Sequence, residues 1–170
     1  MSTLPQPEVW MRGPIKGIPA LLQPIAHTLL QAKEEICFYL QDFPDDLLWR
    51  RPANMASVGF HLQHIVGVLD RLFTYAERKG LSEEQFDYLD KEGHLDLSLS
   101  TKILVERVIN KIDLVINKLR LIDEELLLEE RGVGRLQYPS TVIGLLFHAA
   151  EHTQRHNGQL LVTSKILLCE

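Results

Sequence analysis

The sequence predicts an all-α fold, a four-helix bundle with a long crossover between the second and third of its long helices. Three observations predict this fold class. Apolar residues recur at steps of three and four through four long segments, which places them on one face of an α-helix. A serine stands just before several helical segments, where an N-cap is expected. No segment shows the alternating apolar and polar pattern of a convincing strand.

The first two long helices lie in the N-terminal half of the sequence. The first is expected over residues 18 to 41, and the segment 43–46 with its proline ends the pattern. Its apolar stripe consists of Leu22, Ile25, Leu29, Ala32, Ile36 and Leu40. The second is expected to follow Ser57, its N-cap, and to reach residues 79–80. Its stripe consists of Val58, Leu62, Ile65, Leu69, Leu72 and Ala76.

The crossover and the third long helix follow. We expect a short helix in the crossover, capped by Ser82 and stopped by Gly93, that contributes little to the core. Ser100 is expected to cap the third long helix. The stripe of that helix consists of Leu104, Val108, Ile112, Val115, Leu119 and Ile122. Residues 131–139, rich in glycine, are expected to form an extended connection after it.

The last long helix carries an unusual stripe. It is expected to begin at Ser140 or Thr141. Its stripe consists of Val142, Leu145, Ala149, His152, His156, Leu160, Thr163 and Leu167. Two histidines therefore occupy positions at which the helical period places core residues.

Length and composition restrict the classes of function. A chain of 170 residues with 45% hydrophobic residues fits one domain over 1–170 with a single core. The net charge of −5 argues against a nucleic-acid partner, so we expect a small-molecule substrate or a protein partner. Two cysteines, Cys37 and Cys169, are too few for a disulfide framework. Because no signal peptide or membrane-spanning stretch is evident, we expect a cytoplasmic protein without membrane association.

The histidines of the second and last helices have the spacing of a metal site. His152 and His156 lie four residues apart, so one ion can reach both imidazoles on the same helix face. The second helix offers a third ligand, with His61 near the middle of its apolar stripe and His64 at the edge, from which a neighbouring helix is within reach. Histidines on an apolar face also occur as core residues bonded to a carbonyl group, and the spacing alone leaves both interpretations open.

A short peptidase motif overlaps the last helix. His148, Glu151 and His152 have the H-x-x-E-H form of inverted zinc peptidases, in which the glutamate is the general base. Such peptidases are much larger proteins with a cleft for an extended substrate. The length of this chain therefore argues against a peptidase.

Longer motifs point to a family. Residues 152–160, HTQRHNGQL, match the pattern H-x-x-x-H-x-G-Q-[IL], and residues 57–66, SVGFHLQHIV, match S-[IV]-G-x-x-x-x-H-[LI]. The segments WRRP at 49–52 and PSTVIGLLFH at 139–148 fit the same order. In this combination the sequence resembles the DinB-like proteins, the damage-inducible, YfiT-type four-helix bundles. The matches span most of the chain.

The resemblance implies a metal site and an activity. It places the family's metal-binding triad at His64, His152 and His156, with His61 in the core and His148 as an additional histidine beside the site. Three imidazoles suit a divalent transition metal such as Zn²⁺, Ni²⁺ or Fe²⁺, most readily zinc or nickel. A low-molecular-weight thiol such as bacillithiol, mycothiol or glutathione would be the cosubstrate of an S-transferase or isomerase. Two alternatives stay open: a hydrolase that uses a metal-bound water, and a noncatalytic bundle that binds metal or a partner. A homodimer is a further expectation.

Overall fold

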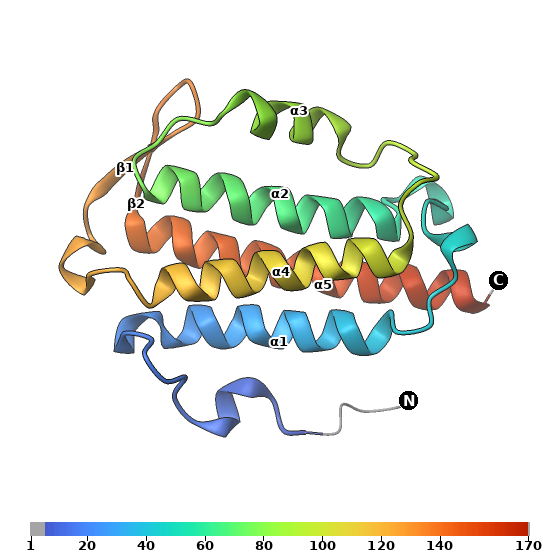
Figure 1. Cartoon of the computed structure of the whole chain (residues 1–170), viewed down its shortest axis with the longest axis horizontal. Coiled ribbons are helices and arrows are strands. Elements are labelled where there is room, and N and C mark those ends of the chain that lie inside the picture. Colours follow the sequence, from blue (N-terminus) through green and yellow to red (C-terminus); the bar gives the residue numbers. More distant parts are fainter. Residues whose placement is uncertain (1–5, 170) are drawn as a thin grey trace.

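Four long helices lie side by side in the computed structural model, which describes residues 6–169 (Figure 1). They are α1 (Gln23–Tyr39), α2 (Val58–Ala76), α4 (Thr101–Leu119) and α5 (Val142–Cys169). The short helix α3 (Glu83–Lys91) belongs to the crossover and lies over α2. Short 3-10 helices occupy Val9–Arg12, Ala20–Leu22, Asp45–Leu47, Pro52–Asn54 and Glu124–Leu126. The predicted all-α bundle with a long crossover is confirmed.

The core lies between the stripes of the four long helices. α2 packs mainly against α5 and α4, and α1 packs against the same two helices, so α1 and α2 are diagonal to one another. Leu29 of α1, Leu62 of α2 and Ile112 of α4 are completely buried. Burying a side chain of this size stabilises the fold by about 1.5–3 kcal/mol relative to its exposure to water. No residue of α3 is buried, which agrees with a crossover that contributes little core.

Polar side chains cap the helices where the sequence indicates. The Ser57 hydroxyl accepts a hydrogen bond from the Phe60 amide, Ser82 forms a capping box with Gln85, and Ser100 caps α4. The predicted start of the first helix is wrong by several residues. Pro24 has no amide hydrogen and its ring excludes an α-helical turn before it, so residues 20–22 form a 3-10 turn and α1 begins at Gln23.

The expectation of no strand is also wrong. β1 (Glu130–Val133) and β2 (Tyr138–Thr141) form an antiparallel pair in which Arg131 lies opposite Ser140. Glycine and proline, both unfavourable in strands, concealed this hairpin. A buried contact stabilises the hairpin despite these residues, because Arg131 Nε donates a hydrogen bond of 2.8 Å to the Ala76 carbonyl at the end of α2. Because Thr141 belongs to β2, α5 begins one residue later, at Val142, and the Thr141 hydroxyl accepts from the Gly144 amide.

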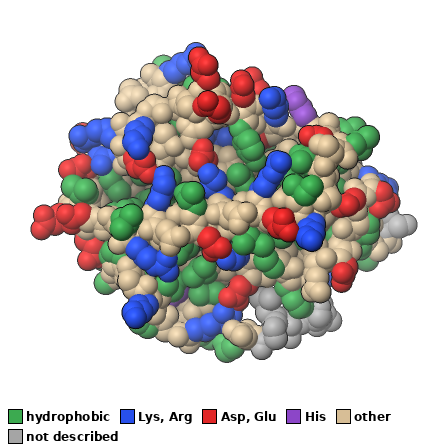
Figure 2. All heavy atoms as spheres, in the orientation of Figure 1, with side chains coloured by type: hydrophobic (Ala, Val, Ile, Leu, Met, Phe, Trp, Pro, Cys, Tyr) green, Lys and Arg blue, Asp and Glu red, His purple; other side chains and the backbone are tan. Residues whose placement is uncertain are grey.

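The surface is mixed in charge. On the face shown in Figure 2, Lys and Arg side chains are interspersed with Asp and Glu, and isolated apolar side chains lie between them. Within residues 6–169, none of the helices combines the length and the apolar character needed to cross a lipid bilayer.

Candidate metal centre

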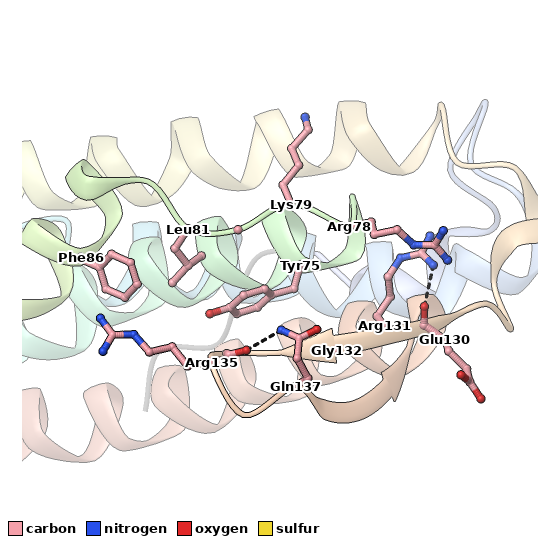
Figure 3. A pocket seen from close by; sticks show the side chains of 12 residues that line it. Tyr75, Arg78, Lys79, Leu81, Phe86, Glu130, Arg131, Gly132, Arg135 and Gln137 are labelled. Atoms are coloured by element: carbon pink, nitrogen blue, oxygen red, sulfur yellow. Dashed lines mark hydrogen bonds between the residues drawn. The ribbon is translucent and has the colours of Figure 1, made fainter.

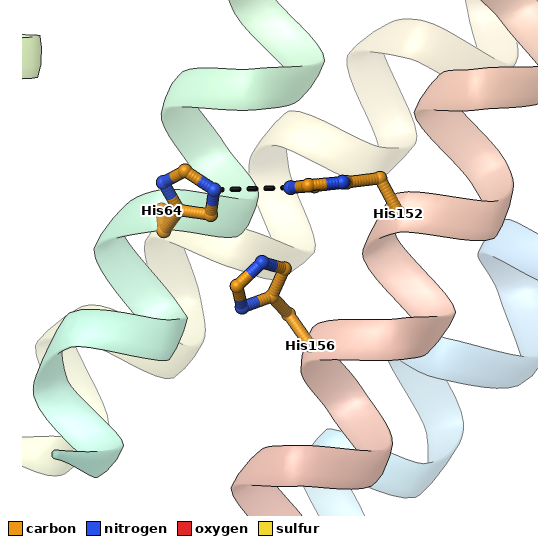
Figure 4. A group of neighbouring side chains, drawn as sticks. All are labelled: His64, His152 and His156. Atoms are coloured by element: carbon orange, nitrogen blue, oxygen red, sulfur yellow. Dashed lines mark hydrogen bonds between the residues drawn. The ribbon is translucent and has the colours of Figure 1, made fainter. Parts of the chain in front are cut away.

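Three histidines from two helices meet between α2 and α5. His64 of α2 faces His152 and His156 of α5 (Figure 4), and one nitrogen from each ring lies within 4.8 Å of the others. His64 Nε2 is 3.0 Å from His152 Nε2. Two nitrogens bound tetrahedrally to one zinc ion at 2.0–2.1 Å are about 3.3–3.4 Å apart. The pair therefore needs only a small adjustment to share an ion.

Helix geometry explains this convergence. His152 and His156 are one turn apart on the stripe of α5 that packs against α2, with ring centroids separated by 4.6 Å. His64 lies at the edge of the α2 stripe, and its ring centroid is 4.5 Å from that of His156. The expectation that an edge histidine reaches a neighbouring helix is confirmed.

The surroundings favour neutral imidazoles. Burial, together with the neighbouring His64, lowers the pKa of His152 to about 4. Burial lowers the pKa of His156 to about 3, with further contributions from His64 and His152. At neutral pH both rings therefore offer a lone pair without first losing a proton, as metal binding requires.

His61 supports the cluster from within the core. Its side chain is buried, as the stripe predicts, and its Nδ1 is 3.0 Å from Nδ1 of His156. Burial lowers the pKa of His61 to about 4. A neutral imidazole has one donor and one acceptor nitrogen, so Nε2 of His156 can bind a ligand when Nδ1 of His156 is the donor in this contact.

Glu92 is a residue at this site that the sequence did not reveal. It follows α3 in the crossover, and its Oε2 is 2.6 Å from Nδ1 of His64. Its Oε1 accepts a hydrogen bond of 2.6 Å from Arg71 of α2. No hydrophobic period or motif marks this position, and only the stop signal at Gly93 indicated that the chain turns there.

Comparison with known proteins identifies the family of this chain. The family model described as the DinB superfamily matches residues 28–160. The chain belongs to the DinB superfamily. No curated protein sequence matches it.

Two solved structures share the DinB-superfamily fold seen here. A conserved protein from Enterococcus faecalis has a TM-score of 0.69 at 18% identity, covering 88% of this chain and 98% of that one. A protein from Streptococcus pneumoniae has a TM-score of 0.59 at 14% identity, covering 83% of this chain and 86% of that one. Both likenesses concern the fold.

The motif at the start of α2 has a packing role in this DinB-superfamily protein. The ring of Trp49, from the WRRP segment, lies so close to Gly59 that a Cβ atom there would be 2.7 Å from it. Phe60 is stacked on His64, with ring centroids 5.1 Å apart and planes inclined by 14°. The motif thus fixes the segment before α2 and one face of the His64 ring.

The peptidase motif has a different arrangement from the one that its chemistry requires. His148, Glu151 and His152 do come within ligand distance of one another. Both oxygens of Glu151, however, accept from Arg155, and Oε1 also contacts His148 Nδ1 at 2.7 Å. A carboxylate held in this way is a poor general base, because Arg155 and His148 lower its pKa against the opposing effect of burial.

Proposed function

We propose that this protein is a metal-dependent enzyme in which His64, His152 and His156 bind one divalent transition-metal ion, zinc or nickel. The observation that carries the proposal is the convergence of three imidazoles whose ligand atoms lie within 4.8 Å of one another. Imidazole is a ligand for both metals, and membership of the DinB superfamily supports a metal-binding role.

The site suits a reaction better than a purely structural ion. Three protein ligands leave at least one coordination position for water or substrate, whereas structural zinc sites are closed by four protein ligands. The side chain of His64 is 19% exposed, so the cluster is in contact with solvent. A small molecule can therefore reach the ligands from outside.

We further propose a thiol-dependent S-transferase or isomerase acting on a small-molecule substrate. The metal would supply Lewis-acid activation of a low-molecular-weight thiol as its thiolate. The chain's own thiols do not serve this purpose: burial raises the pKa of Cys37 on α1, and Cys169 is at the far end of α5. A separate thiol cosubstrate is thus the simplest source of the nucleophile.

Elemental analysis of protein purified without an affinity tag tests the metal site. We expect about one zinc or nickel ion per chain, lost in His64→Ala and in His152→Ala. The exposed His94, outside the cluster, provides the control, and His94→Ala is expected to retain the metal. Absence of metal from the wild-type protein, even after incubation with Zn²⁺ or Ni²⁺, would refute the site.

Turnover assays then separate the classes of function. Metal-loaded protein is incubated with an electrophile together with bacillithiol, mycothiol or glutathione, and in parallel with esters and amides alone. Thiol-dependent turnover that is lost with the metal supports the transferase. Turnover of esters without a thiol would instead identify a hydrolase, and metal binding without any turnover would identify a binding protein.

A further inference from the structure

Glu92 is a nearly buried carboxylate in an otherwise exposed crossover. Its side chain is only 4% exposed. Each carboxylate oxygen has its own partner on α2: Oε2 contacts Nδ1 of His64 and Oε1 accepts from Arg71, both at 2.6 Å. Removing a carboxylate from water is costly unless hydrogen bonds replace its solvation, so this arrangement depends on both partners.

Gly67 of α2 leaves room for this carboxylate. A Cβ atom at Gly67 would lie less than 3.0 Å from Glu92 Oε1 and from the Arg71 guanidinium. Glycine within a helix costs about 1 kcal/mol relative to alanine. The close approach of Glu92 provides a physical reason for glycine at this position.

The turn after Glu92 is fixed as well. Gly93 has a φ of +80°, and its amide donates a hydrogen bond of 2.7 Å to Gln63 Oε1 of α2. The ring of Phe60, which stacks on His64, lies against Gly93. The Tyr88 hydroxyl donates to the Gln63 carbonyl at 3.1 Å. These contacts fix the backbone beside Glu92 against α2.

We propose that Glu92 is a positioning residue that keeps the His64 proton on Nδ1 and so keeps the Nε2 lone pair directed at His152 and His156. An ionised carboxylate only accepts hydrogen bonds, so the nitrogen facing it must be the donor. Because a neutral imidazole has one N–H, Nε2 is then the acceptor, which is the form that binds a metal. This role rests on the proposed metal site.

Glu92→Gln is the decisive variant because it keeps the shape of the side chain but replaces the acceptor that faces His64 Nδ1 with a donor. Arg71 only donates, so the new amide oxygen turns towards it and the NH₂ group meets Nδ1 of His64. The proton of His64 must then move to Nε2, where it blocks the metal. We expect zinc affinity to fall about 10–100-fold, measured by competition with a chromophoric chelator. The exposed Glu83 of α3 supplies the control, and Glu83→Gln is expected to bind zinc like the wild type.

Gly67→Ala tests the same arrangement without changing any charge. The added methyl group displaces Glu92 from His64, so zinc affinity is expected to fall although alanine favours the helix. Gly158 of α5 is the matched control, since a Cβ atom there meets no atom within 4 Å. Gly158→Ala should leave zinc affinity unchanged. Wild-type affinity in both Glu92→Gln and Gly67→Ala would overturn the proposal while leaving the metal site intact.

The tautomer of His64 gives a readout that needs no metal. Two-bond ¹H–¹⁵N correlation spectra of protein stripped of metal report which ring nitrogen carries the proton. We expect a proton on Nδ1 in the wild type and its loss from Nδ1 in Glu92→Gln. A wild-type ring without a proton on Nδ1, or identical spectra in the two proteins, would overturn the role of Glu92. If the wild type binds no metal, the proposed function fails, and the spectra still decide whether Glu92 orients His64.

Discussion

Polar side chains gather in two regions along α2, one formed by histidines and the other mainly by charged side chains. Near its start, His64 meets His152 and His156 with nitrogen atoms directed at one another. At its end, a cleft of about 630 Å³ opens between α2, α3 and the hairpin (Figure 3). The cleft is lined by Tyr75, Arg78, Lys79, Gly80, Leu81, Phe86, Glu130, Arg131, Gly132, Gly134, Arg135 and Gln137.

The cations of the cleft are already engaged with the protein itself. Arg131 donates to the Ala76 carbonyl and to Glu129, and Lys79 pairs with Glu77. Arg135 lies over the ring of Phe86, 5.8 Å from its centroid. The histidine cluster instead brings together imidazole nitrogens whose partners are one another and Glu92. The two regions thus differ in the chemistry of their polar groups, because the cleft gathers charged side chains whereas the cluster gathers imidazoles that could bind one metal ion.

Acid should separate the two regions most strongly, because the buried imidazoles of the histidine cluster gain protons as the pH falls. The pKa values of His61 and His152 are lowered to about 4 and that of His156 to about 3. The unfolded chain, with histidine pKa values near 6.5, binds more protons than the folded chain between about pH 6.5 and 4. The contribution of these histidines to the free energy of unfolding is therefore fully present above about pH 6.5, and it is lost as the pH falls from about 6.5 to 4.

Urea unfolding of protein stripped of metal, at a series of pH values, measures this loss. Each imidazole that stays neutral in the folded chain contributes up to about 1.4 kcal/mol per pH unit, so the three together predict a slope of about 2–4 kcal/mol per pH unit between pH 6.5 and 4.5. In His61→Leu, which removes one buried imidazole outside the triad, the slope should be shallower. Stability that does not change across the window would contradict the lowered histidine pKa values.

Arg131→Met should destabilise the hairpin side of the cleft and leave the histidine cluster unchanged. The substitution keeps an apolar chain but leaves the Ala76 carbonyl without its buried donor, at a cost of about 1–3 kcal/mol. Lys79→Met, at an exposed position of the same cleft, should change stability by less than about 0.5 kcal/mol. Both are measured by chemical denaturation. A loss of zinc affinity in Arg131→Met would contradict the separation of the two regions.

Local patterns predicted most of the bundle. The stripes of the long helices and the caps at Ser57, Ser82 and Ser100 depend on residues close together in the sequence, so they could be identified without tertiary information. The convergence of His152 and His156 follows from the helical period alone. The hairpin was missed because its pairing depends on the contact of Arg131 with the end of α2, which no local pattern records.

The remainder of the site depends on how the crossover packs. His64 and Glu92 are separated by 28 positions, and no periodic pattern connects them. Glu92 reaches His64 because Gly67 has no side chain in its way and because the chain turns at Gly93. Neither glycine indicates this contact until α3 is packed against α2. The triad itself could be predicted, because His64 lies at the edge of a helix stripe and because the sequence matches a family motif. The partners that orient its rings required the packed structure.

Arg135→Ala is the smallest of these tests, and it examines whether the cleft is merely part of the surface. Arg135 and Phe86 are both exposed, and a cation–π contact at an exposed site contributes about 0.5–1 kcal/mol. We expect a loss of about 0.5 kcal/mol in chemical denaturation, with zinc affinity unchanged, because the contact joins the hairpin only to α3. Phe86→Leu removes the same contact from the other side, so the double variant should cost no more than the sum of the single variants. A loss above about 2 kcal/mol would show that the hairpin holds the crossover in place, and hence that the cleft and the histidine cluster are coupled through α3.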